Sequence, residues 1–298
     1  MKYRLIKIAL LILFIGSVTL DSIQAEEWIT PSLTYDSSTG NYIIKYGPVS
    51  SPVTLIYELP NKINPSVNTS IESIGEGIYQ YRYKLYNGND SLQKLQSFEI
   101  RYWSVPISSE APDKGWYSRS LATEPTWRWD DTKYQRFGIS PGASLEGFSL
   151  TAPGLPGIVN AYFQGYVEDV VFPYEPPDEI EDPLTEIDLN VEKSYVSRKT
   201  LGPTAPPADF KPASFIDYII NMKHEAFSLG WITSYGIEQS LDAKLDNAKK
   251  KIEQGNKNAA KNILGAFINE VEAQRDKHLT SEAYGLLKYN VQYLIGKL

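Results

Sequence analysis

Few side chains in this sequence combine the types and spacing that a catalytic or metal-binding site requires. His224 and His278 are its two histidines, the residue type that most often exchanges protons or binds metals near neutral pH. The local pattern places His224 within a helix and His278 in a loop before Thr280, and neither has a second ligand at a metal-binding spacing. Cysteine is absent, which excludes thiol nucleophiles and thiolate metal sites. We therefore predict no metal ion, no cofactor and no enzymatic activity.

The acidic residues need separate consideration, because two positioned carboxylates are enough for glycoside hydrolysis. Glu124, Asp130 and Asp131 lie close to Trp127 and Trp129 and form the best such group. The competing interpretation is a solvated acidic loop held by aromatic side chains. The sequence has none of the motifs of serine hydrolases, zinc proteases, phosphate-binding loops or EF-hands. A hydrolase with a carboxylate pair therefore stays open only as the less favoured hypothesis.

The same stretch also suggests a binding surface. Exposed tryptophan and tyrosine rings stack on sugars while neighbouring acids bind hydroxyl groups, although large aromatic side chains fill protein cores as well. The candidate ligand-binding residues are Trp116, Tyr117, Trp127, Arg128, Trp129 and Asp130. Burial of both Trp127 and Trp129 would exclude such a surface.

The composition is that of an ordinary globular chain. It has 298 residues, of which 42% are hydrophobic and 22% are charged, and this length is enough for about two domains. The formal net charge is −7, and there are no blocks of Lys or Arg. We predict no nucleic-acid partner, because binding to phosphates requires a basic surface.

The first 25 residues have the three parts of a secretory signal peptide. Lys2, Arg4 and Lys7 precede an apolar run, residues 8–18, and a polar stretch then ends at Ala25. The run is shorter than the ~20 apolar residues of a membrane-spanning helix, and no second run of that length follows. We expect cleavage after Ala25, export to the periplasm or the cell exterior, and no membrane span in the remaining chain.

Residues 26–174 are predicted to form an all-β sandwich domain. Short strand-like runs are separated by clusters of Gly, Pro and Asn, without a convincing helical run between them. Residues 37–40 predict a hairpin turn. The run 78–86 alternates, which puts Tyr79, Tyr81, Tyr83 and Leu85 on its core face. The Trp-rich stretch between residues 108 and 136 is expected to be irregular.

Residues 175–212 are acidic and rich in proline, which predicts a semi-rigid connector. Proline fixes φ and discourages both helix and central strand. The alternative that residues 187–196 add one edge strand to the sandwich stays open.

Residues 213–298 predict a small all-α four-helix bundle. Apolar residues recur with a helical period, and each run has an end signal: Gly230 stops the first, Gly255 is placed to follow the second, and Thr280 is a suitable N-cap for the last. Amphipathic helices joined by short connections pack as antiparallel neighbours. The fold class is therefore a β-sandwich domain followed by a helical bundle.

The bundle resembles the FIMAH domain, a helical module of bacterial exported proteins. The resemblance rests on Gly230-Trp-Ile, on residues 255–260 (GNKNAA) and on residues 266–271 (AFINEV), and it covers residues 213–298. Residues 147–158 and 199–207 resemble an uncharacterised exported β-domain that precedes such bundles. The resemblance implies export and a modular architecture, without catalytic residues.

These observations give two main hypotheses for function. The first is an exported, non-catalytic interaction or structural protein of unknown ligand, whose partner is another exported protein. The second is a carbohydrate-binding or adhesion protein that holds an extracellular glycan with the Trp-rich stretch.

Overall fold

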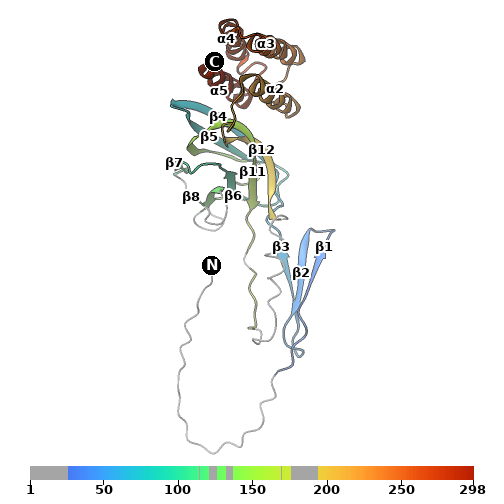
Figure 1. Cartoon of the computed structure of the whole chain (residues 1–298). Helices are drawn as coiled ribbons and strands as arrows, with labels where there is room; N and C mark the ends of the chain where they lie inside the picture. The colour runs from blue at the N-terminus through green and yellow to red at the C-terminus, as the bar shows by residue number, and fades with distance from the viewer. Residues whose placement is uncertain (1–25, 114, 121–125, 132–136, 169, 176–193) are drawn as a thin grey trace, which may run out of the picture.

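The computed structural model describes residues 26–113, 115–120, 126–131, 137–168, 170–175 and 194–298. The predicted signal peptide, residues 1–25, lies outside the described residues, and so does Glu124. Three antiparallel sheets are followed by four helices, which confirms the predicted fold class (Figure 1).

The first sheet is small and stands apart from the rest of the β-structure (Figure 1). It consists of β1 (Ser32–Asp36), β2 (Asn41–Tyr46) and β3 (Val53–Glu58) in that order. The predicted hairpin joins β1 to β2, and Gly40 takes the positive φ of 70° that its turn requires. Tyr42, Ile44 and Leu59 form a separate core, against which Phe172 packs from much later in the chain.

Two larger sheets form the sandwich. The four-stranded sheet has the order β4-β5-β10-β7, with β4 (Pro65–Gly75), β5 (Ile78–Asn87), β10 (Ser144–Pro153) and β7 (Ser108–Glu110). The five-stranded sheet has the order β12-β11-β6-β9-β8, with β12 (Val196–Thr204), β11 (Leu155–Gly165), β6 (Leu95–Arg101), β9 (Thr126–Asp131) and β8 (Trp116–Ser120). Tyr79, Tyr81, Tyr83 and Leu85 are buried in the hydrophobic core, as their alternation predicts.

The β-region differs from the predicted sandwich in three ways. Residues 32–58 form their own sheet instead of joining the sandwich. The stretch predicted to be irregular contains β7, β8 and β9. The predicted connector, residues 175–212, contains β12, which pairs with β11 along its whole length; residues 176–193 lie outside the described residues. The proline content of β12 makes its sequence resemble a connector. Proline is nevertheless tolerated in an edge strand, and Pro203 lies in this one.

Four helices complete the chain: α2 (Pro212–Ser228), α3 (Tyr235–Glu253), α4 (Lys257–Gln274) and α5 (Ser281–Lys297). Their ends agree with the sequence signals. Gly230 and Gly255 have positive φ just after α2 and α3, and the Thr280 side chain accepts a hydrogen bond from the Ala283 amide at the start of α5.

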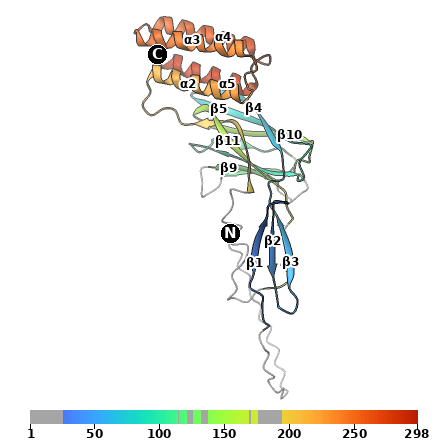
Figure 2. The same cartoon turned by 90° about the vertical axis from the view of Figure 1, so that its right-hand side faces the viewer.

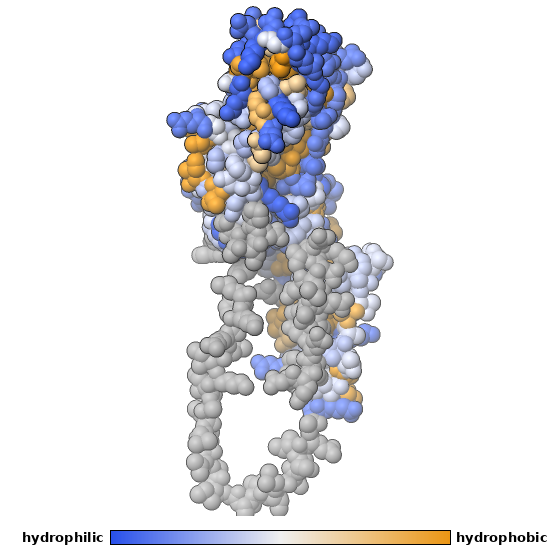
Figure 3. All heavy atoms as spheres, viewed as in Figure 1, coloured by the Kyte–Doolittle hydropathy of each residue, from blue (hydrophilic) through white to orange (hydrophobic). Residues whose placement is uncertain are grey.

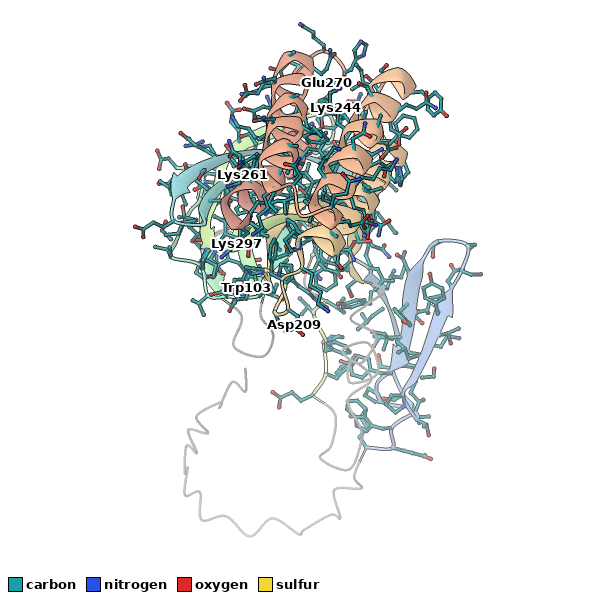
Figure 4. The ribbon with its side chains drawn as sticks, turned by 45° about the horizontal axis from the view of Figure 1, so that its top comes forward. Trp103, Asp209, Lys244, Lys261, Glu270 and Lys297 are labelled. Carbon is teal, nitrogen blue, oxygen red and sulfur yellow. The ribbon has the colours of Figure 1, made fainter. Side chains whose placement is uncertain are left out.

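The helices lie in two layers. Helices α3 and α4 form the outer layer, and α2 and α5 lie next to the sandwich (Figure 2). Lys244 of α3 and Glu270 of α4, labelled in Figure 4, join the outer pair through an ion pair of 2.8 Å. Among the described residues, no helix is both long enough and apolar enough to cross a membrane.

Helix α5 is covered by the other helices on one side and by the sandwich on another, and it has buried side chains on both. Leu287, Val291 and Leu294 are fully buried, and the buried Tyr289 and Asn290 donate to backbone carbonyl groups of the sandwich. The sandwich and the bundle consequently share one continuous hydrophobic core. A helix that is apolar on most sides is expected in such a central position.

Candidate binding surface on the five-stranded sheet

Side chains alternate between the two faces of the sheet along β8 and β9, so the six predicted ligand-binding residues do not share one face. Trp116, Trp127 and Trp129 point into the sandwich. Trp129 is fully buried and stacks on Phe98 at 5.0 Å, Trp116 is buried against Phe148, and Trp127 is half-buried. The expectation that these three rings form an exposed surface is therefore not met for Trp116 and Trp129.

Tyr117, Arg128 and Asp130 point to the outer face of the same sheet, where Arg128 is the centre of a polar cluster. Its guanidinium donates to Asp130 Oδ1 and to Glu99 Oε1, both at 2.5 Å. It also donates to Gln164 Oε1 at 3.0 Å and to the Tyr195 hydroxyl at 3.2 Å. Arg128 thus holds together four side chains, which come from β6, β9, β11 and the residue before β12.

Both carboxylates of the cluster have further partners. Arg119 of β8 donates to Asp130 Oδ2 at 3.1 Å, and the Tyr195 hydroxyl donates to Glu99 Oε1 at 3.1 Å. Burial raises the pKa of Glu99, and the charge of Arg128 opposes that rise. Burial also raises the pKa of Tyr195, and the negative charge of Glu99 is the second cause that raises it. Every charged group here is paired with an opposite charge, so the cluster is already neutralised from within.

Aromatic and cationic side chains surround this cluster. Tyr117 is 40% exposed, and the Arg119 guanidinium lies 5.8 Å from its ring centre. On the opposite side, Tyr162 packs edge-on against Tyr195 at 6.1 Å, and Arg101 lies over the Tyr162 ring at 5.5 Å. Flat rings with polar groups beside them can bind a ligand by stacking and hydrogen bonding together.

Glu99, Gln164 and Tyr195 belong to this site as well, and they were not among the residues predicted from the sequence. Alternation in residues 97–101 would have placed Glu99 on the outer face, opposite Phe98 and Ile100. No local signal, however, reveals that β6 and β11 neighbour β9, because that order comes from the sheet topology. The side chain of Asp131, a predicted member of the carboxylate group, lies outside the described residues, as Glu124 does.

A second charged group lies in the bundle and could be mistaken for a metal site. His224 Nε2 lies 3.2 Å from Asp242 Oδ2 and 3.3 Å from Glu238 Oε1, although no ligand stands near His224 in the sequence. The fully buried ammonium of Lys223 pairs with the same two carboxylates. That ammonium supplies the positive charge that a metal ion would bring, so the geometry is that of an ion-pair network joining α2 to α3.

The outer face of the four-stranded sheet carries a shallow groove of about 490 Å³. Its walls include Arg82, Lys84 and Glu146 from β5 and β10. Arg82 pairs with Glu72 at 3.0 Å and Lys84 with Glu146 at 3.8 Å, and all four side chains are largely exposed. This is the arrangement of a solvated sheet face.

Exposed apolar side chains gather at one side of the sandwich, near β7 (Figure 3). Trp103, Val105 and Ile107 follow β6, and each is about half exposed or more. The indole of Trp103 (labelled in Figure 4) donates to the Pro153 carbonyl at 3.2 Å. The exposed tryptophan of this protein is therefore Trp103, outside the cluster around Arg128.

Comparison with known families bears on the helical part of the chain. Residues 228–296 match the model of the FIMAH domain. The segment from α3 to α5 is therefore similar to a FIMAH domain. The match covers the turn before α3, α3, α4 and nearly all of α5, which confirms this part of the predicted resemblance over residues 213–298, whereas α2 lies before the match. The FIMAH match therefore reaches the surface of α5 that packs on the sandwich.

The β-region gives a weaker comparison. A solved structure titled "Crystal structure of an uncharacterized protein from Nocardia farcinica reveals an immunoglobulin-like fold" is 12% identical, with a TM-score of 0.29. The similarity covers 47% of this chain and 98% of that chain. A search of curated proteins finds no match.

Proposed function

We propose that this chain is an exported, non-catalytic interaction protein that contacts its partner through the outer face of the five-stranded sheet. The observation that carries this proposal is the pairing of both carboxylates with arginine. Glu99 and Asp130 each accept from Arg128, and Asp130 accepts from Arg119 as well. Each carboxylate is therefore already engaged as an ion-pair partner within the sheet.

The same face has the features of a recognition surface. Its polar cluster fixes the sheet in one arrangement, and Tyr117 and Arg119 extend from it toward solvent. Tyrosine and arginine are the residue types that most often dominate binding energy when a partner covers them. The partner expected here is another exported protein or an extracellular glycan.

A carbohydrate is the second candidate, and the pair Tyr117–Arg119 favours it. The ring supplies a stacking surface, and the arginine beside it supplies donors for sugar hydroxyls. This version of the carbohydrate hypothesis uses Tyr117 and Arg119, the latter held by Asp130 at 3.1 Å, and does not require Trp116 or Trp129.

A panel of bacterial and host glycans, scored for both binding and hydrolysis, tests the two functions. Binding without turnover is expected, with at least a ten-fold loss in Tyr117→Ala and in Arg119→Ala. Tyr218→Ala is a matched control, because Tyr218 on α2 is exposed to the same 40%. Turnover that disappears in Asp130→Asn would overturn the non-catalytic proposal, and absence of glycan binding leaves a protein partner as the expected ligand.

Export has its own test. The mature chain recovered from the producing cells is expected to begin at Glu26, as measured by mass spectrometry of the intact protein. Recovery of an uncleaved chain from the cytoplasm would contradict export.

A further inference from the structure

Strand β4 is an edge strand whose outward side is covered by a helix. Within its sheet β4 pairs only with β5, so every second residue turns its backbone N–H and C=O away from the sheet. Thr69, Ile71 and Ser73 are the residues that do so beneath α5. Open edges of this kind are templates for pairing with another strand.

Side chains of α5 form hydrogen bonds with four of these six backbone groups. The Thr69 amide donates to the carboxylate of Glu282, and Ser281 Oγ donates to the Thr69 carbonyl at 2.9 Å. The Tyr289 hydroxyl donates to the Ile71 carbonyl and accepts from the Ser73 amide, both at 3.3 Å. The helix thus takes the place that the backbone of a neighbouring strand would occupy.

The helix lies directly on the strand. A Cβ atom added to Gly285 would stand 3.2 to 3.4 Å from atoms of the Ile71 side chain, and the Tyr289 ring packs on Tyr79 at 5.1 Å. The close approach favours glycine at position 285, because a Cβ atom there would require the Ile71 side chain to shift by a few tenths of an ångström.

The outward groups of β4 are self-complementary. Thr69 and Ser73 lie two residues to either side of Ile71. In an antiparallel pair of two copies centred on Ile71, Thr69 of one copy would face Ser73 of the other, and each opposed pair would exchange two hydrogen bonds. A dimer with its two-fold axis at Ile71 would therefore form hydrogen bonds with the same four backbone groups that α5 binds in the monomer.

The geometry points to a function for the helical module as a cap that blocks dimerisation of the sandwich through β4. The occupant of the uncapped edge is β4 of a second copy of this chain. This surface is distinct from the outer face of the five-stranded sheet, so the inference does not depend on the function proposed above.

A full-length triple variant, Glu282→Ala, Gly285→Trp and Tyr289→Ala, uncaps the edge. It removes three of the four hydrogen bonds and places an indole against Ile71. Light scattering is expected to give a two-fold rise in molar mass, with the amides of Thr69 and Ser73 still protected from hydrogen exchange. A variant that stays monomeric at every concentration overturns the proposal.

Two further variants separate strand pairing from unfolding. Adding Thr69→Pro to the triple variant removes the outward N–H, so the protein is expected to return to a monomer; association that persists shows that β4 is not the contact and overturns the proposal. In the otherwise cysteine-free chain, Ile71→Cys with Gly285→Cys puts the two Cβ atoms about 3.3 Å apart, close to disulfide geometry. This pair is expected to form an intramolecular disulfide and a monomer, and failure to crosslink overturns the docked arrangement.

Discussion

Glu282, the second residue of α5, accepts a hydrogen bond from the main-chain amide of Thr69, 213 positions earlier in the chain. Both residues are buried, Glu282 with 2% of its surface exposed. A carboxylate in this position is stabilised by the N-terminal end of the helix dipole, which compensates part of the cost of its burial. One side chain therefore serves its own helix and the edge of a distant sheet.

Replacement of Glu282 by alanine is expected to lower the free energy of unfolding by about 1–3 kcal/mol. The substitution leaves the buried Thr69 amide without its acceptor, and an unsatisfied buried donor costs about that much. Urea denaturation measures the change. Glu253→Ala, which alters an exposed residue at the end of α3, is the control and is expected to stay within about 0.5 kcal/mol of the parent chain.

Arg128→Ala is expected to destabilise the sandwich by about 3 kcal/mol. The substitution removes the cation shared by Glu99 and Asp130, whose side chains are only 8% exposed, and a broken buried ion pair costs about 3–5 kcal/mol. Arg119→Ala is the matched control, because half of its side chain is exposed and such pairs contribute about 0–1 kcal/mol. Equal effects of the two substitutions in a thermal melt would contradict a central role for Arg128.

Lys223→Met is expected to weaken the contact between α2 and α3 by about 3 kcal/mol, because it leaves Glu238 and Asp242 facing each other without a buried cation. His224→Ala, next to it in sequence but half exposed, is expected to have little effect. Guanidinium denaturation followed by far-UV circular dichroism reports on the helices. A larger loss for His224→Ala would show that the histidine, and not Lys223, holds the network together.

The turn between β1 and β2 gives a prediction about pH. Hydrogen bonds from the Ser38 hydroxyl, the Thr39 hydroxyl and the Ser38 amide lower the pKa of Asp36 from 3.8 to about 2. Since the folded-state pKa is depressed, the stabilisation of the turn is complete above pH ~4 and is lost as the pH falls through about 2. Carbon-detected NMR titration of Asp36 measures this midpoint, and Ser38→Ala is expected to move it upward.

Much of the fold could be predicted from local sequence. The ends of the helices follow from Gly230, Gly255 and Thr280, because a left-handed glycine and a side-chain cap act within a few residues of themselves. The core face of β5 follows from strict alternation. Strand β12 could not be predicted in this way, because its proline-rich sequence resembles a connector and only its pairing with β11 makes it a strand.

The candidate site was predicted in part, for a related reason. Trp127, Arg128, Trp129 and Asp130 are neighbours in sequence, but the side chains of a strand point alternately to opposite faces of the sheet. The aromatic half of the motif belongs to the core and the polar half to the surface. The partners of Arg128 come from β6 and β11, and their approach depends on a strand order that no single segment encodes.

The distance along the chain between β4 and α5 has a consequence for how the protein is made. Residues leave the ribosome in order, so β4 emerges long before residues 281–297. During that interval the strand has no helix to cover it, and any other chain at a similar stage offers the same bare edge. The nascent protein is therefore more prone to aggregation than the finished one, and delay in releasing the last helix prolongs that danger.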